Sequence, residues 1–423
     1  MEKIIFHIDV NSAFLSWEAT YRMKELGETE DLRLIPSAVG GSEKSRHGIV
    51  LAKSESAKKY GVTTGEPLVD ARRKCPNLKT VPANFPIYVK YSNAMIKILE
   101  DYSPDIEQYS IDESFMDMTG MQTLLGPPLE AAHNIKDRIY RELGFTVNIG
   151  ISTNKLLAKM ASDFKKPNLV HTLFPEEVPT KMWPLPVSEL FFVGRQTTKR
   201  LHALGIFTIG DLAHTDKKVI TDNLKGHGDV IWEFANGNGD SMEEVANRNR
   251  KPANKGYSNE TTLAFDVTDA ALAKEILLSL TETVATRVRA DKSYISVISV
   301  YYVDNAFKHS SRQMTLESAT NVTNEIYRHV CQLFDLLWNG SPIRLLGVQT
   351  SKATNEAHRQ YSLFETQNVE KLSKLDSAID AIRNKYGEDS IKRASFVRPE
   401  EAGIKHMSGG LNKAKRDSAK KED

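Results

Sequence analysis

The sequence predicts an α+β protein built from several domains, and three patterns carry this prediction. The first ~170 residues alternate short β-branched apolar runs with segments of helical spacing. Residues 173–245 have helical spacing with glycine-marked turns, and residues 256–353 contain a β-α-β order that occurs twice. A chain of 423 residues has room for two to four domains at roughly 100–200 residues each.

Three segments in the first part of the chain are expected to form strands. Lys3–Asp9 is an apolar run that ends in an acid, and Thr146–Ser152 is a second β-branched run. Between them, Ile106–Thr119 has the pattern of two strands with acids at the bend. The sequence KLLAKMASDF has helical spacing, and Ser152 or Thr153 is expected to cap that helix.

Two polar segments interrupt these patterns. Ala38–Gly65 is rich in glycine and basic residues, and we expect it to be too polar to contribute to a core. Ala246–Lys255 is polar, basic and interrupted by Pro252, which is typical of a linker.

The repeat predicts a four-stranded sheet with two helices on one face. After it, a tail helix is expected to be amphipathic, since Leu372, Leu375, Ile379, Ile382 and Tyr386 fall on one helical face. The repeat has the order strand, helix, strand, strand, helix, strand, over Tyr257–Val267, Asp269–Asp291, Tyr294–Asp304, Ser310–Ser318, Asn321–Trp338 and Ile343–Thr350.

Composition limits the class of protein. Hydrophobic residues make up 40% and charged residues 26%, which excludes a wholly disordered chain. No run of about 18 apolar residues predicts a membrane span, and MEKIIFHID lacks the pattern of a signal peptide. Cys75 and Cys331 are too far apart in sequence for a disulfide framework, so a reducing cytoplasm is expected. With a net charge of +1, any polyanion would have to be bound by local basic patches.

Three acids stand out by their positions. Asp9 ends the first predicted strand, and Asp112 and Glu113 are consecutive at a strand bend, where both carboxylates can point to one place. Such an oxygen site suits Mg²⁺, and two ions can activate a hydroxyl and stabilise a leaving pyrophosphate. From position alone, the favoured interpretation of Asp9 and Asp112 is that they are turn acids exposed to water.

Three long motifs add a resemblance. HIDVNSAFLSWEA, YSIDESFMDMTG and NIGISTNKLLAKMASDFKKPN resemble the palm motifs of the Y-family translesion DNA polymerases, in the bacterial branch of DinB and UmuC. The resemblance implies a right-hand polymerase with a ferredoxin-like palm and small fingers. It assigns residues 1–172 to the palm, with fingers inserted at about 26–76, and 173–245 to a helix-hairpin-helix thumb. Residues 246–255 would be a linker, 256–353 the β-α-β-β-α-β little finger, and 354–423 a tail.

The activity that the resemblance implies is template-directed DNA synthesis from dNTPs on primer-template DNA. It would insert nucleotides opposite damaged bases with low fidelity and without a proofreading exonuclease, as a cytoplasmic monomer. Asp9, Asp112, Glu113 and the Val10 carbonyl would hold two Mg²⁺ ions, for which Mn²⁺ could substitute.

Phe14 resembles the family's steric gate, an aromatic ring that leaves no room for a ribose 2′-hydroxyl. Without the motif, it would be interpreted as an ordinary core phenylalanine at a strand-to-helix turn. Ile49 and Leu51 resemble the roof over the templating base pair.

The lysines Lys58 and Lys159 match positions that contact the triphosphate in the family. Glu55 departs from the pattern, because relatives in the DinB branch have a tyrosine there. Lys155 and Lys159 are spaced i, i+4 and would project from one side of their helix. Lysines 53, 58 and 59 could instead form a solvated helix face.

FFVGRQTTKRLHALGI resembles a helix-hairpin-helix in which Gly194 lets backbone N–H groups approach a phosphate. The match is partial, since only one glycine is present at the turn. These contacts would position DNA without reading its sequence. The basic candidates are Arg195, Lys199 and Arg200 in this segment, and Lys255, Arg287, Arg289, Lys308, Arg312 and Arg344 in the repeat.

The segment QYSLF resembles the peptide by which bacterial polymerases bind the sliding clamp. Leu363 and Phe364 would enter a hydrophobic groove while Gln360 bonds at its rim. The alternative is that both apolar side chains pack back onto the chain.

Two other functions remain open from the sequence. One is a degenerate member that scaffolds repair proteins without chemistry, which the presence of all three acids disfavours. The other is a Mg²⁺-dependent cyclase or nucleotidyl transferase on the same palm, which would need no duplex-binding domains.

Overall fold

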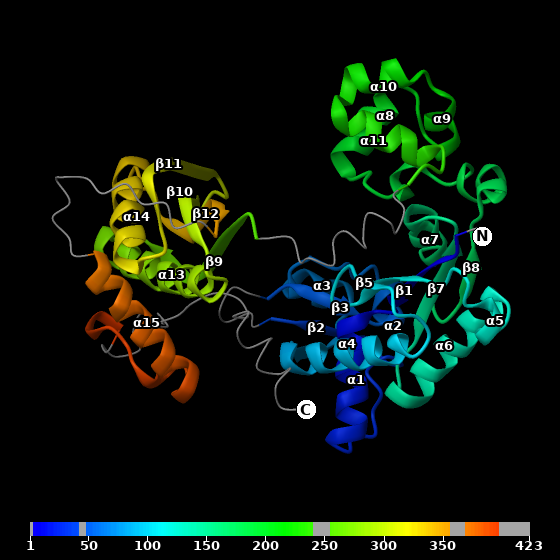
Figure 1. Ribbon diagram of the computed structural model, residues 1–423, viewed down its shortest axis with the longest axis horizontal. Coiled ribbons are helices and arrows are strands. Elements are labelled where there is room, and N and C mark those ends of the chain that lie inside the picture. Colours follow the sequence, from blue (N-terminus) through cyan, green and yellow to red (C-terminus); the bar gives the residue numbers. More distant parts are fainter. Residues whose placement is uncertain (1–2, 42–47, 240–253, 356–368, 397–423) are drawn as a thin grey trace. The chain divides into compact units, whose positions relative to one another are not determined.

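The computed structural model describes residues 3–41, 48–239, 254–355 and 369–396. The chain divides into two compact units, and the division between residues 251 and 252 falls inside the segment expected to be a linker. In the described residues, the first unit contains two β-sheets and the second contains one (Figure 1).

The first unit contains a five-stranded sheet with the order β5-β6-β1-β7-β8. The three segments expected to form strands all do so. All six residues of β1 are buried, because helices α1, α4 and α6 cover one face of the sheet and α7 packs against β1 and β7 on the other. The elements of this domain are β1 (Ile5–Val10), α1 (Ala13–Glu25), α4 (Phe85–Glu100), β5 (Ile106–Gln108), β6 (Glu113–Asp117), α5 (Gln122–Leu125), α6 (Pro128–Leu143), β7 (Val147–Ser152), α7 (Lys155–Ser162) and β8 (Val170–Thr172).

Helix α7 approaches the sheet closely because β7 has a glycine beneath it. Gly150 pairs with His7 of β1, and its missing side chain lets the backbone of α7 approach. The cap of α7 was predicted wrongly. Asn154, not Ser152 or Thr153, accepts a hydrogen bond from the Leu157 N–H.

Replacing Gly150 by alanine is expected to lower the free energy of unfolding by about 3 kcal/mol. The added Cβ would lie 1.9 Å from the Ala158 carbonyl oxygen and 2.5 Å from the Ser162 nitrogen, so only displacement of α7 relieves the clash. Chemical denaturation measures the loss. Gly194→Ala is the control, because its Cβ has no described atom within 4 Å and φ is −89°. Equal midpoints for the two variants would contradict this close approach.

A small three-stranded sheet with the order β3-β2-β4 is inserted between α1 and α4. The expectation that Ala38–Gly65 contributes nothing to a core was wrong, since Ala38, Val50, Ala57 and Val62 of this segment join a small separate core. The sheet also extends past residue 76, because β4 pairs with β2 in parallel. Its elements are β2 (Ser37–Gly40), β3 (Val50–Lys53), α2 (Glu55–Lys59), α3 (Leu68–Lys74) and β4 (Lys79–Pro82).

A helical domain follows β8 and shares a core with α7. Leu156 and Leu157 of α7 pack in the same apolar cluster as the helices of this domain, and the Asn154 side chain donates a hydrogen bond to the Gly237 carbonyl (3.0 Å). This cluster fixes the helical domain to one end of α7. Its main helices are α8 (Arg195–Ala203), α9 (Ile209–His214), α10 (Lys217–Leu224) and α11 (Gly226–Ala235).

The second unit confirms the β-α-β-β-α-β prediction. Its sheet has the order β11-β10-β12-β9, all neighbours are antiparallel, and both helices pack on one face over a single apolar core (Figure 1). Its elements are β9 (Gly256–Val267), α13 (Ala270–Ala290), β10 (Tyr294–Asp304), β11 (His309–Thr320), α14 (Thr323–Leu337) and β12 (Ile343–Thr354).

The tail helix, α15 (Val369–Tyr386), buries the charged residues Asp376 and Arg383, whereas its expected apolar face is only partly covered. Arg289 of α13 forms ion pairs with Asp380 (2.6 Å) and Asp376 (3.3 Å), and Asp376 also accepts the Thr323 N–H at 2.8 Å. By contrast, Tyr386 on the expected apolar face is 67% exposed. The helix therefore depends on burying its acids against α13 and α14.

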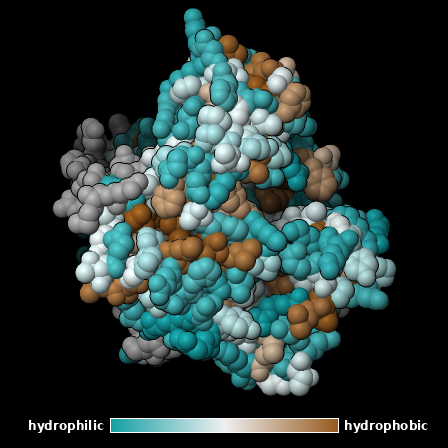
Figure 2. All heavy atoms as spheres, turned by 90° about the vertical axis from the view of Figure 1, so that its right-hand side faces the viewer, coloured by the Kyte–Doolittle hydropathy of each residue, from teal (hydrophilic) through white to brown (hydrophobic). Residues whose placement is uncertain are grey.

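The face drawn in Figure 2 is largely hydrophilic, with hydrophobic side chains in separate patches. Apolar residues scattered in this way are normal for a protein surface. Within the ranges that the structure describes, every helix is too short or too polar to cross a membrane.

Candidate active site

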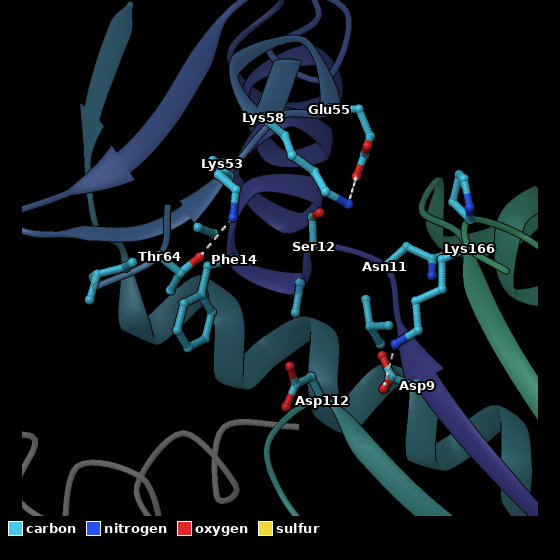
Figure 3. A pocket seen from close by; sticks show the side chains of 15 residues that line it. Asp9, Asn11, Ser12, Phe14, Lys53, Glu55, Lys58, Thr64, Asp112 and Lys166 are labelled. Carbon is cyan, nitrogen blue, oxygen red and sulfur yellow. Dashed lines mark hydrogen bonds and ion pairs between the residues drawn. The ribbon is translucent and has the colours of Figure 1, made fainter. Parts of the chain in front are cut away.

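A cavity of about 420 Å³ lies at the end of β1, where the five-stranded sheet meets the small three-stranded domain. Figure 3 shows Asp9 and Asp112 on one side of it and Lys58 with Glu55 on another. It is lined by residues 9–14 at the β1–α1 junction, by Leu51, Ala52, Lys53, Glu55, Lys58 and Thr64 of the small domain, and by Asp112, Lys166 and Pro167.

The structure brings the three predicted acids to one end of two neighbouring strands. Asp9 of β1 is paired directly with Glu113, the first residue of β6, and the Val10 N–H donates to the Asp112 carbonyl at 3.1 Å. Asp112 lies in the bend before β6, so its side chain escapes the strand alternation and lines the cavity. Each carboxylate has a different partner: Lys166 for Asp9, Ser110 for Asp112 and Lys159 for Glu113.

Asp9 is the most strongly perturbed of these acids. It is 8% exposed, and burial raises its pKa to about 7, with the negative charge of Glu113 adding to the rise. Lys166 opposes the shift through an ion pair at 3.0 Å, and it also pairs with Asp163 at 2.9 Å. A positive charge beside the end of β1 therefore stabilises the ionised form of the Asp9 carboxylate.

The donor set suits a divalent cation, because carboxylate oxygens are the ligands that Mg²⁺ prefers. In the described ranges, no three His, Cys, Asp or Glu side chains are gathered into a metal site. Asp9 instead binds the Lys166 ammonium, which shows that this position attracts a cation. Asp9, Asp112, Glu113 and the Val10 carbonyl are the residues that would hold a metal.

Phe14 lines the cavity from the first turn of α1, and other aromatic rings hold it in place. Its ring stacks on Tyr88 with centroids 4.9 Å apart, and Phe85 and Trp17 contact it at 5.9 and 6.1 Å. The Tyr88 hydroxyl donates to the buried Glu18 at 3.1 Å, which fixes the supporting ring. Phe14 is therefore a rigid apolar wall.

On the side of the small domain, Lys58 pairs with Glu55 at 3.7 Å, and both side chains are about two-thirds exposed. Such a pair is weak, so Lys58 is available to a ligand. Lys53 also lines the cavity and donates to Thr64 at 3.3 Å. Leu51 lines the cavity, whereas Ile49, the other residue expected to form the roof, is not among the lining residues and is 43% exposed.

The lysine that reaches the cavity from the α7 region is Lys166, which sequence reasoning missed. Lys159 does not line the cavity; its ammonium lies 2.7 Å from Glu113. Helix α7 ends at Ser162, and the chain then turns back towards β1, where the Asn168 N–H donates to the Asn11 side chain at 2.9 Å. This turn, and not helical spacing, places Lys166 beside Asp9.

Two helix N-termini meet in the helical domain. Gly194 precedes α8 without a side-chain cap, so the first N–H groups of α8 are left for another acceptor. The second N-terminus was missed: Lys225 has a positive φ of 57° and leads into α11 at Gly226. His227 joins the two ends through a 3.4 Å contact with Thr197. Arg195, Lys199 and Arg200 on α8 are exposed.

One candidate in the second unit needs correction. Arg289 was predicted to contact DNA, but its side chain is 11% exposed and pairs with Asp376 and Asp380, so its charge is already neutralised. Arg312 is exposed on β11, and Arg344 lies over the Phe307 ring. Arg287 donates to the Ser258 carbonyl at 3.0 Å. The peptide residues Gln360, Leu363 and Phe364 lie outside the described residues.

Family models match three parts of the chain. The impB/mucB/samB family matches residues 8–163, its C-terminal domain matches 254–363, and its helix-hairpin-helix motif matches 175–206. A protein named DNA polymerase IV from Clostridium acetobutylicum is 46% identical over 405 residues, which cover 95% of this chain and all of that protein. DNA polymerase IV 1 from Bacillus subtilis is 35% identical over 96% of each chain.

A solved structure supports the fold. A Y-family DNA polymerase chimera of Dbh and Dpo4 is similar with a TM-score of 0.70 and 22% identity, over 84% of this chain and all of that one. The two sheets of the first unit fit the palm and fingers of such a polymerase, and the second unit fits its little finger. The helix-hairpin-helix match falls in the helical domain, which corresponds to the thumb. The chain therefore belongs to the impB/mucB/samB family and is a DinB-like member of the bacterial Y-family DNA polymerases.

Proposed function

We propose that this DNA-directed DNA polymerase inserts deoxynucleotides opposite damaged template bases, with low fidelity, by two-metal-ion nucleotidyl transfer and without proofreading. The observation that carries the proposal is the cavity at the end of β1. It combines two acids, Asp9 and Asp112, with the lysines Lys58 and Lys166 and the fixed ring of Phe14.

Each part of the cavity has a role in this reaction. Lys58 and Lys166 attract the triphosphate, and Phe14 lies under the sugar. Metal ions held by the acids supply activation of the primer 3′-hydroxyl and stabilisation of the leaving pyrophosphate. Lys166 pairs with Asp9 at 3.0 Å and lines the same cavity, so its ammonium is placed beside both the proposed metal ligands and the bound triphosphate.

Primer extension tests the proposal directly. The protein is incubated with Mg²⁺, all four dNTPs and two primer-templates that differ only by an abasic site in the template. Extension past the abasic site is expected. Absence of extension on either template would indicate a scaffold protein, and nucleotide cyclisation without template would indicate a cyclase. The lack of proofreading is tested separately, by the persistence of the 3′ nucleotide of a primer with a mismatched terminus.

The peptide QYSLF supports a further proposal, that the polymerase binds the sliding clamp through Gln360, Leu363 and Phe364. A clamp raises the local concentration of enzyme at the primer end without any new DNA contact. Leu363→Ala combined with Phe364→Ala is therefore expected to leave unassisted extension intact and to abolish stimulation by the clamp. Calorimetry measures clamp binding, and unchanged affinity of the double variant would exclude this peptide as the tether.

A further inference from the structure

Lys159 is a buried lysine next to a catalytic acid, outside the cavity that binds the substrate. It lies on the face of α7 that covers the palm sheet, is 7% exposed, and its Nζ is 2.7 Å from Oε1 of Glu113. A lysine is costly to bury unless its charge is paired. The position of Lys159 therefore depends on the Glu113 carboxylate, and the carboxylate depends on the lysine in turn.

Two aromatic rings confine the ammonium group. Its Nζ lies 5.8 Å from the centroid of Tyr109, in the bend before Glu113, and 5.4 Å from that of Phe191, at the start of the thumb. The Phe191 N–H contacts the Met160 sulphur at 3.4 Å, which fixes this ring to α7. Rings and carboxylate together leave Lys159 little freedom.

The two carboxylate oxygens of Glu113 have different surroundings. Lys159 takes Oε1, and Oε2 remains for a divalent cation. A carboxylate held by one oxygen has a fixed orientation, as do metal ligands that are held by an outer partner. Glu113 is otherwise only partly enclosed, with 19% of its side chain exposed, and it stands beside the like charge of Asp9.

We propose that Lys159 is a positioning residue that holds Glu113 in the orientation required for metal-dependent nucleotidyl transfer. The proposal rests on the proposed function and replaces the role in triphosphate binding that the sequence assigned to this lysine. The two roles predict different kinetics. A positioning residue controls kcat with little effect on nucleotide affinity, whereas a triphosphate ligand controls nucleotide affinity.

The same helix provides a matched control one turn earlier. Lys155 pairs with Glu107 at 2.5 Å, its side chain is 11% exposed, and its Nζ lies 5.2 Å from the ring of Phe115. The two lysines therefore have similar burial, a similar ion pair and a similar ring contact. The difference that the experiment uses is the partner, since Glu107 is not a proposed metal ligand, and Lys155 lies near one ring where Lys159 lies near two.

The experiment compares Lys159→Met with Lys155→Met, because methionine keeps the apolar stem and removes the charge. Single-nucleotide incorporation at saturating Mg²⁺ gives kcat, and dNTP binding is measured separately on a complex whose primer ends in a 3′-dideoxynucleotide and cannot react. We expect kcat of Lys159→Met to fall by about 10- to 100-fold, with the dNTP Kd changed less than about threefold. Lys159→Arg, which keeps the charge and a donor, should recover part of the loss.

Three results would overturn the proposal. The first is a fall in kcat for Lys159→Met that exceeds the fall for Lys155→Met by less than about fivefold. The second is a dNTP Kd that weakens along with kcat in Lys159→Met. The third is a kcat for Lys159→Arg that is no higher than the kcat for Lys159→Met. If Lys159→Met does not fold, the same criterion is applied to Lys159→Gln against Lys155→Gln. An unsubstituted protein without any activity would instead contradict the proposed function.

Discussion

Asp9→Ala and Glu113→Ala are expected to lower nucleotide incorporation by several orders of magnitude while primer-template binding persists. Each change removes one carboxylate from the group that would hold the metal ions, and a two-metal reaction depends on all of its ligands. The proposed DNA contacts are residues of the thumb and little finger, and these acids are not among them. Rapid-quench kinetics measures incorporation, and fluorescence anisotropy measures DNA binding.

Asp9→Asn removes the negative charge of Asp9 and keeps nearly the same side-chain shape. Burial raises the pKa of Asp9 to about 7, so at pH 8 the carboxylate is ionised and destabilises the metal-free fold. The amide that replaces it in Asp9→Asn is neutral, so the variant should be at least as stable as the unsubstituted protein at that pH. This variant should therefore fold and still be inactive. Asp117→Asn at the other end of β6 is the control, since its side chain accepts the Thr119 N–H and is not a proposed metal ligand. Near-normal extension by Asp9→Asn would refute the assignment of Asp9.

Local patterns predict that the acids converge at one place, whereas their role as metal ligands follows from the motif resemblance. A strand that ends in Asp9 and a bend that contains Asp112 are both visible in the sequence, and neighbouring strands bring their ends together. The little finger could be predicted for the same reason, since strand and helix periods alternate over its whole length.

The contacts of three lysines could not be predicted from local sequence patterns. The i, i+4 spacing correctly places Lys155 and Lys159 on one side of α7, but it does not say what they face. Glu107 and Glu113 are their partners, from strands about 50 residues earlier in the chain. Lys166 escaped prediction because it follows the end of α7, in a turn whose direction depends on Asn11 and Asn168.

Helix α15 was misjudged for a different physical reason. Its apolar spacing suggests that Leu375 and Ile382 are buried, yet the helix buries Asp376 and Arg383 instead. Arg383 pairs with Glu282 of α13 at 3.0 Å, far away in sequence. Amphipathic spacing assumes that apolar contact decides which face is buried, and buried ion pairs can override that assumption.

Phe14 gives the second large expected effect, on the selection of the sugar. The ring can exclude a 2′-hydroxyl only if it cannot move aside, and its stack on Tyr88 and its contacts with Phe85 and Trp17 hold it still. A ribonucleotide would then overpack the cavity, at a cost of about 1–3 kcal/mol. That cost corresponds to roughly a 10- to 200-fold preference for dNTPs.

Phe14→Ala is therefore expected to use ribonucleotides about 10- to 200-fold better than the unsubstituted protein, while dNTP incorporation continues. The measurement is the ratio of kcat/KM for a dNTP and its matching rNTP on one primer-template. Phe85→Ala is the comparison variant, because it removes one of the rings that hold Phe14 still without opening the cavity wall, and its ratio should change less than that of Phe14→Ala. If Phe14→Ala is folded and active but keeps the original ratio, Phe14 is a packing residue and the sugar is selected elsewhere.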